Sequence, residues 1–306
     1  MATAVLVNPE LGVAPPALHM TDWAVSRLAG IPFAKMTGSG NDFVVFDARR
    51  VDGSLVTQPQ VIQAICNRHN GIGADGVVLL EAKPNGADAR IHYYNSDGSA
   101  ADLCGNATLC SASMAVELQL GSADGLSLWT DAGLIHSRIV NGTPEIDLEP
   151  VVNVNASANI ERLPDELRIG FAVVGVPHLV VLCNDVQTVD VQGRGAELRR
   201  HQWTGPQGAN VNFVSRTAKG SWRYRTFERG VEGETLACGT GSIAAGILLV
   251  IWELAESPVA LWTSSGRLAT VTLRPDTVVA GAFRPSLRGE GRVVFRGETG
   301  AILLPV

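Results

Sequence analysis

The sequence has no excess of basic residues. Its 24 Lys and Arg residues are outnumbered by 30 Asp and Glu residues, so the formal net charge is −6. The basic residues are scattered and form no stripe, which argues against nucleic acid or an anionic membrane surface as a partner. A small polar or zwitterionic substrate is compatible with this charge pattern.

Disulfide frameworks, leader peptides and long apolar runs are also missing. Five cysteines, an odd number without framework spacing in 306 residues, indicate free thiols in a reducing compartment. The first Arg is Arg27, and prolines interrupt the apolar residues before it, unlike a secretory signal. The longest apolar run, 243–252, is shorter than the ~20 residues of a membrane span. We therefore expect a soluble cytoplasmic protein with a loose N-terminal extension at 1–32.

Two cysteines stand in matching surroundings. Cys238 is followed by a Gly-Thr-Gly turn and then by a run of small and apolar residues, and Cys104 is followed by a Gly-Asn turn and a similar run. Each pattern predicts a thiol at the start of a buried helix, where unpaired N–H groups and the helix dipole favour thiolate over thiol. The two cysteines lie 238 − 104 = 134 positions apart, which indicates an internal duplication.

The order of predicted elements supports the duplication. In each half a strand, at 90–94 and at 222–227, leads through a polar turn with acidic residues into the Cys-Gly helix. Hydrophobic residues make up 46% of the chain, which allows two cores of ordinary size. We predict a mixed α/β protein with a first domain at 33–150 and a second at 151–290, with a final strand at about 291–306 returning to the first.

Paired thiols at two related helix starts are suited to proton transfer at carbon. A thiolate removes a proton from one face of a carbon while the opposing thiol donates one to the other face, and no covalent adduct is needed. Charge that develops on the substrate requires preorganised N–H donors, which helix N-termini supply.

Three other interpretations stay open on local sequence. Metal binding is disfavoured because Cys104 and Cys110 are separated by five residues and no C-x-x-C occurs. A cysteine hydrolase with His178 as its base leaves the second matched cysteine unexplained. The third interpretation is that both cysteines are structural residues at helix starts, and it would be preferred if the two halves of the sequence did not repeat the same pattern. Glycines 71, 73 and 76 match G-x-G-x-x-G, but the predicted helix precedes them and the strand follows, which is the wrong order for a dinucleotide site.

Several segments together resemble the diaminopimelate epimerase family. They occur in the family's order between about residues 33 and 300, and they are 33–43, 71–76, 95–99, 104–106, 177–178, 210–213, 228–230 and 237–241. The resemblance implies a cofactor-independent epimerase that converts LL- to meso-diaminopimelate on the route to lysine and peptidoglycan. It also implies two pseudo-symmetric α/β domains, each with a mostly antiparallel sheet wrapped around a central helix, and a homodimer.

The resemblance assigns roles to particular residues. Cys104 and Cys238 would be the acid/base pair, supported by His178 and Glu228. The substrate α-carboxylate would be held at the helix starts by Gly105, Asn106, Gly239 and Thr240, and other substrate polar groups by Asn41, Asn95, Asn210 and Arg229. No metal and no cofactor are expected, and the partner is a small amino-acid substrate.

The chain departs from the family pattern beside the first cysteine. Ala107 and Leu109 stand where the family usually has Gly and Arg, and Val176 stands where many members place a substrate-binding Asn. These departures keep two alternatives open, a racemase of another amino acid in a specialised pathway and a non-catalytic binding protein of the same fold.

Overall fold

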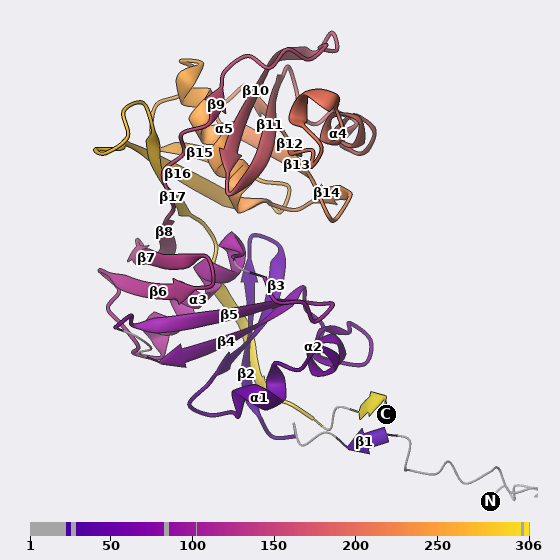
Figure 1. The fold of residues 1–306 in the computed structure, drawn as a ribbon, viewed down its shortest axis with the longest axis vertical. Helices are drawn as coiled ribbons and strands as arrows, with labels where there is room; N and C mark the ends of the chain where they lie inside the picture. The colour runs from indigo at the N-terminus through magenta and orange to yellow at the C-terminus, as the bar shows by residue number, and fades with distance from the viewer. Residues whose placement is uncertain (1–22, 26–28, 83–85, 102, 301–302, 306) are drawn as a thin grey trace, which may run out of the picture.

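A computed structural model describes residues 23–25, 29–82, 86–101, 103–300 and 303–305. The chain forms two lobes of similar build, one above the other in Figure 1. Most of the expected extension, 1–32, lies outside the described residues. Of the part that is described, β1 (Trp23–Val25) pairs antiparallel with β19 (Leu303–Pro305), and β2 begins at Pro32.

The first lobe contains seven consecutive strands and three helices. The strands are β2 (Pro32–Gly38), β3 (Asn41–Asp47), β4 (Gly76–Ala82), β5 (Ala89–Asn95), β6 (Leu126–Thr130), β7 (Gly133–Val140) and β8 (Thr143–Asp147). The helices are α1 (Gly53–Val56), α2 (Pro59–Cys66) and α3 (Gly105–Glu117). The helix α2 precedes the Gly71–Gly76 loop and β4 follows it, so this glycine loop has the order that the sequence predicted.

The second lobe repeats this inventory with two short strands, β9 and β14, added. Its strands are β9 (Val154–Asn155), β10 (Glu166–Val174), β11 (Val176–Cys183), β12 (Asn210–Arg216), β13 (Trp222–Glu228), β14 (Gly233–Thr235), β15 (Val259–Trp262), β16 (Leu268–Pro275) and β17 (Phe283–Arg288). Its helices are α4 (Val191–Arg199), the 3-10 turn η1 (Gln202–Thr204) and α5 (Gly239–Ile251). The helix α4 begins at Val191 because Asp190 caps it, accepting from the Gly193 N–H.

The duplication is visible in the strand pairing. From β2 to β8, successive pairs run antiparallel, parallel, antiparallel, parallel, antiparallel and antiparallel. From β10 to β17, with β14 set aside, the same order recurs. A parallel step needs a crossover, and the helices α2, α3, α4 and α5 lie in these crossovers. The chain is therefore a mixed α/β fold built twice from one pattern.

Strands cross between the two repeats in both directions. The strand β9 follows the first repeat along the chain and pairs with β10 of the second. The strand β18 (Arg292–Glu298) follows the second repeat and pairs antiparallel with β2 of the first. In addition, β8 of the first lobe and β17 of the second pair directly, which ties the two lobes to each other.

The helices α3 and α5 form the centres of the two lobes. Each has 13 residues, and nine residues of each are buried. The strands of the first lobe surround α3, and those of the second surround α5. Both helices belong to one continuous apolar core, whereas α2 and α4 cover separate cores on the outer faces of the sheets. Cys110 of α3 is buried in the shared core, and Cys66 and Cys183 are buried in the two outer cores, as expected for packing residues.

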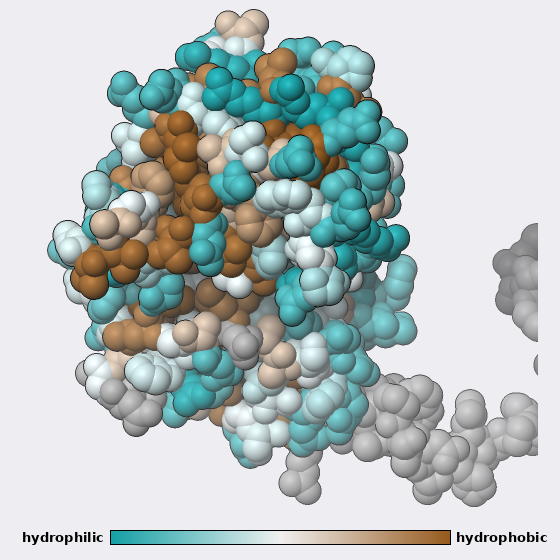
Figure 2. Space-filling view, turned by 45° about the horizontal axis from the view of Figure 1, so that its top comes forward, coloured by the Kyte–Doolittle hydropathy of each residue, from teal (hydrophilic) through white to brown (hydrophobic). Residues whose placement is uncertain are grey.

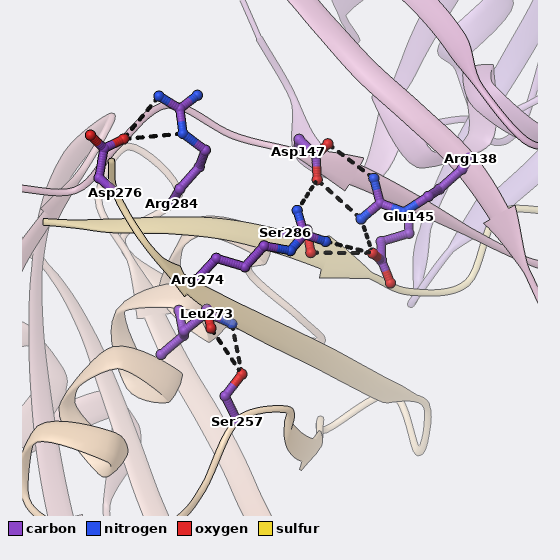
Figure 3. Close-up of polar contacts among 9 residues, drawn as sticks. All are labelled: Arg138, Glu145, Asp147, Ser257, Leu273, Arg274, Asp276, Arg284 and Ser286. Atoms are coloured by element: carbon purple, nitrogen blue, oxygen red, sulfur yellow. Dashed lines mark hydrogen bonds and ion pairs between the residues drawn. The ribbon is translucent and has the colours of Figure 1, made fainter. Parts of the chain in front are cut away.

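A polar cluster joins the lobes where β8 meets β17 (Figure 3). Arg138 of β7 contacts Glu145 and lies 2.9 Å from Asp147 of β8. From the other lobe, Ser286 of β17 donates to Glu145 at 3.2 Å, and Arg274 of β16 lies 3.6 Å from Asp147. These contacts hold the two lobes in a defined relative position around the helix starts.

The surface is mixed in character. Figure 2 shows polar residues over most of one face and apolar residues gathered along one side. The side chains of Val294 and Phe295 on β18 are 49% and 48% exposed, and that of Trp262 on β15 is 45% exposed. Among the described residues, no helix is both long and apolar enough to cross a membrane.

Candidate active site

Both matched cysteines cap a central helix. Cys104 is the N-cap of α3, with φ −133° and ψ 114°, and Cys238 is the N-cap of α5, with φ −127° and ψ 117°. Cys238 is buried and Cys104 is half-buried. The predicted placement of both thiols at helix starts is what the structure shows.

The two helix starts lie against each other at the junction of the lobes. A Cβ added to Gly105 would lie 3.9 Å from the Cα of Gly239, and a Cβ on Gly239 would meet the Leu287 side chain at 3.0 Å. The first turns of α3 and α5 therefore lie side by side, which brings the positive ends of two helix dipoles to one place. At Gly105 a Cβ would make only an ordinary contact, whereas at Gly239 it would crowd the Leu287 side chain.

The thiol of Cys104 has several hydrogen-bond partners. The backbone N–H groups of Asn106 and Ala107 and the hydroxyl of Tyr93 interact with it and lower its pKa, whereas burial and the charge of Glu228 raise it. Burial is the largest effect, and the net pKa lies above the ordinary value for cysteine. The pKa of Cys238 is also raised, first by burial and then by Glu228, although Thr240 and the N–H of Gly241 oppose this.

These pKa directions differ from the sequence-based expectation that a helix start lowers the thiol pKa. The N–H donors are present, but burial, which is fuller at Cys238 than at Cys104, disfavours the thiolate more than these donors favour it. Both sulfurs are therefore thiols at neutral pH.

Glu228 stands at the end of β13 beside Cys238. Its carboxylate accepts from the Thr235 hydroxyl and interacts with the Cys238 thiol, and burial raises its pKa above the usual value. The Oγ1 of Thr240 lies 3.6 Å from the Cys238 Sγ. The structure thus brings Cys238, Glu228 and Thr240 together, as the family resemblance implied.

Tyr93 and Asn95 form the corresponding surroundings of Cys104. Both lie on β5, two residues apart, so their side chains project from the same face of the sheet. The Tyr93 hydroxyl donates to Asn95 Oδ1 at 3.1 Å and lies within hydrogen-bonding reach of the Cys104 thiol. Gly76 leaves room for the Tyr93 ring, because a Cβ there would lie 2.7 Å from it.

Asn41 and Asn106 are joined by a hydrogen bond. The Asn106 Nδ2 donates to Asn41 Oδ1 at 2.7 Å, and the Asn41 Nδ2 donates to Asp75 at 3.0 Å. Asp75 is held in turn by Arg68 at 2.6 Å. This chain of contacts orients the amide of Asn106 in the first turn of α3.

His178, Asn210 and Arg229 lie together in the second lobe. His178 of β11 pairs in register with Asn210 of β12, and Asn210 Oδ1 accepts from the backbone N–H of Arg229 at 2.7 Å. His178 is fully buried, and burial with the nearby charge of Arg229 lowers its pKa to about 3. Its ring contacts the amide of Asn212. The hydroxyl of Tyr224 contacts both this amide and the backbone carbonyl of Cys238.

Sequence reasoning missed Tyr93, Asn212 and Tyr224. Two of them carried a usable signal, since Tyr93 lies two residues before Asn95 and Asn212 two residues after Asn210, and alternate residues of a strand share a face. Tyr224 gave no such signal, because its contact with the backbone of Cys238 depends on how α5 packs on β13. Among the described residues, no group of three or more His, Cys, Asp or Glu side chains is placed to hold a metal ion.

Comparison with known proteins identifies the family. The family described as diaminopimelate epimerase matches residues 33–154 and 170–281. A diaminopimelate epimerase of Gemmatimonas aurantiaca is 58% identical over 272 residues, covering 87% of this chain and 98% of the relative. The chain belongs to the diaminopimelate epimerase family. A second relative, the diaminopimelate epimerase of a Hydrogenobaculum species, is 35% identical over 86% of this chain and 96% of its own length.

Solved structures of more distant proteins share the fold. A phenazine biosynthesis protein of the PhzF family from Bacillus anthracis superposes with a TM-score of 0.68 at 17% identity, covering 88% of this chain and 98% of that one. At this identity the likeness concerns the fold alone. It agrees with the repeated α/β pattern found in the strand pairing.

Proposed function

We propose that the protein is a diaminopimelate epimerase, an isomerase that interconverts LL- and meso-diaminopimelate in the synthesis of lysine and of peptidoglycan precursors. The observation that carries the proposal is the pair of cysteine N-caps on two abutting helix starts, in a chain 58% identical to a diaminopimelate epimerase. The two repeats, taken as domains 33–150 and 151–290, enclose the substrate between them.

In the proposed reaction, one sulfur acts as base and the other as acid. The thiolate takes the α-proton, the electron pair of the C–H bond stays on the α-carbon, and the opposing thiol gives its proton to the other face. The centre is inverted, and the two sulfurs exchange protonation states. Cys104 and Cys238 carry the two roles, and the direction of the reaction decides which is the base.

The helix starts bind the α-carboxylate. The backbone N–H groups at Gly105, Asn106, Gly239 and Thr240 belong to the first turns of α3 and α5, where N–H groups lack helical partners. The positive ends of the two helix dipoles then stabilise the negative charge that develops when the α-proton leaves. The charge of the substrate ammonium group favours ionisation of the neighbouring thiol.

The remaining family residues are proposed to orient the substrate. Glu228 supports Cys238, and His178 supports the reacting centre from β11. Asn41, Asn95, Asn210 and Arg229 bind other polar groups of the substrate. No cofactor or metal takes part in this scheme.

The departures from the family pattern are proposed to leave the chemistry intact. Ala107 and Leu109 are each 1% exposed, and a Cβ on Gly289 would meet the Leu109 side chain at 3.1 Å. Leu109 therefore packs inside the lobe. The identity of the amino acid is decided by groups other than this side chain.

Proton exchange in deuterated water tests the substrate. The protein is incubated with LL-diaminopimelate and, separately, with a panel of other L-amino acids, and deuterium at the α-position is measured by mass spectrometry. We expect incorporation into diaminopimelate together with formation of the meso isomer. Incorporation into another amino acid alone would assign the chain to a racemase of that compound, and no incorporation anywhere would indicate a non-catalytic protein.

The two-sulfur scheme has its own test. Cys104→Ala and Cys238→Ala each remove one proton carrier, so racemisation should fall below detection in both. The variants Cys66→Ala and Cys183→Ala, which alter buried thiols of the outer cores, serve as matched controls. Near-full turnover in either of the first two variants would contradict the scheme.

We also propose a cytoplasmic homodimer formed through β18. This strand pairs with β2 along one edge and exposes Val294 and Phe295. Arg292 and Glu298 stand at opposite ends of β18, so an antiparallel pairing of two copies brings ends of opposite charge together. Phe295→Glu should give a monomer in sedimentation velocity, whereas Trp262→Glu, on another exposed strand, should leave the dimer intact.

A further inference from the structure

The amide of Asn212 is held in one orientation. Its Nδ2 lies 2.8 Å from the carbonyl oxygen of Leu179, which can only accept a hydrogen bond. Its Oδ1 lies 2.8 Å from the hydroxyl of Tyr224 and 3.0 Å from that of Thr226, and both hydroxyls can donate. A flipped amide would place two oxygens against each other at Leu179. The nitrogen of the amide therefore faces Leu179.

This orientation determines where His178 carries its proton. The second hydrogen of Asn212 Nδ2 points to Nδ1 of His178, 3.3 Å away. A nitrogen that accepts a hydrogen bond has no proton of its own, and a neutral imidazole carries a single N–H. The proton of His178 is therefore on Nε2.

Nε2 of His178 is buried and has no hydrogen-bond partner among the described residues. A buried N–H without a partner is unfavourable, and functional sites account for many such groups. His178 lies on the face of the sheet that packs on α5, since Val180, two residues further along β11, belongs to the core around that helix. The free N–H thus lies in the layer beneath the second cysteine helix, near Arg229.

The network also reaches the cysteine itself. The hydroxyl of Tyr224 lies 3.3 Å from the carbonyl oxygen of Cys238. Gly241 allows this approach, because a Cβ there would lie 2.2 Å from Asn212 Oδ1 and 2.3 Å from the Tyr224 hydroxyl. Asn212, Tyr224 and Thr226 are each at most 1% exposed, so water does not compete for these contacts.

We propose that Asn212 is a positioning residue that holds His178 as its Nε2–H tautomer, so that His178 offers a hydrogen-bond donor to the bound amino-acid substrate. The second half of this statement rests on the proposed epimerase function, whereas the tautomer does not. Tyr224 and Thr226 act indirectly, because their hydroxyl groups hold the amide oxygen of Asn212 in place.

The tautomer can be measured without substrate. Protein labelled with ¹⁵N in its six histidines gives ring ¹⁵N–¹H correlations in which the two tautomers differ, and the spectrum of His178→Gln assigns the signals of His178. We expect a proton on Nε2 and a bare Nδ1 in the wild type. A proton on Nδ1 would overturn the proposal.

Two variants test the role of Asn212. In Asn212→Asp a carboxylate oxygen faces Nδ1, so the proton should appear on Nδ1. In Asn212→Ala the amide donor is lost, so both tautomers should be populated. In each, kcat for diaminopimelate should fall at least tenfold with a smaller change in KM. Asn155→Asp, on exposed β9, is the matched control and should change neither readout.

The outcomes separate this proposal from the proposed function. Suppose that the Nε2–H tautomer is lost in Asn212→Ala but the wild type is inactive on diaminopimelate. This result would support the positioning role of Asn212 and refute the substrate assignment. An unchanged tautomer and kcat in both variants of Asn212, with an active wild type, would refute the positioning role alone.

Discussion

Replacement of Gly241 by alanine is expected to damage both stability and catalysis. An added Cβ would lie 2.2 Å from Asn212 Oδ1 and 2.3 Å from the Tyr224 hydroxyl, about 1 Å closer than ordinary contact. One of these groups must move, and the 2.8 Å hydrogen bond between them is then strained or lost. Gly241 stands in the first turn of α5, where the backbone cannot retreat without moving the Cys238 cap.

The size of the effect follows from three contributions. Overpacking a buried site costs about 1–3 kcal/mol, and leaving a buried polar group unpaired costs about 1–3 kcal/mol. Alanine recovers up to about 1 kcal/mol through its higher helix propensity. The free energy of unfolding should therefore fall by about 1–5 kcal/mol. Displacing a cysteine cap by about 1 Å should lower kcat by about 100-fold.

Urea denaturation and the deuterium-exchange assay measure the two effects. Gly125→Ala is the matched control, because a Cβ there would meet no atom within 4 Å. The control should keep wild-type stability and turnover. If Gly241→Ala unfolded at the wild-type urea concentration and kept full activity, the close packing of α5 on the network around Asn212 would be refuted.

Three further predictions concern charged and polar groups. Arg194 and Glu166 form a buried ion pair at 2.8 Å, so Arg194→Met should lower the free energy of unfolding by about 3–5 kcal/mol in urea titrations. As a control, Arg200→Met, which changes an exposed side chain, should alter this free energy by less than about 1 kcal/mol. His178 has a pKa of about 3 in the folded state and near 6.5 in the unfolded state, so the unfolded state binds more protons between these pH values and the free energy of unfolding falls as the pH drops below 6.5. Between pH 7 and 5 the wild type should lose about 2 kcal/mol of stability relative to His178→Gln. Equal losses in the two proteins would contradict a buried neutral imidazole. The Tyr93 hydroxyl lowers the pKa of Cys104, so in Tyr93→Phe the pH midpoint for alkylation of Cys104, followed by mass spectrometry, should move upward, while Tyr94→Phe should leave it in place.

Several features of the site were predictable from local sequence. A Cys-Gly pair followed by small residues predicts a helix whose N-cap is the cysteine. The small residues let the helix pack closely in the core, and the cysteine side chain makes no capping hydrogen bond that would occupy its thiol. The spacing of the two motifs indicated the duplication, and the repeated order of antiparallel and parallel strand pairs bears it out. The family residues Glu228 and Thr240 lie beside Cys238, since a short segment that contains only β14 connects β13 to α5.

Other features required the tertiary structure. The pKa directions of the two thiols depend on how completely the opposing lobe excludes water, and this burial has no signature in the residues around each cysteine. The contact of Gly105 with Gly239 and the links from Asn212 to His178, Tyr224 and Leu179 join segments that lie 12 to 134 residues apart. Local sequence determined that each half would present a thiol at a helix start. Only the packing of the lobes decided that the two starts meet, that burial keeps both thiols neutral, and which nitrogen of His178 holds the proton.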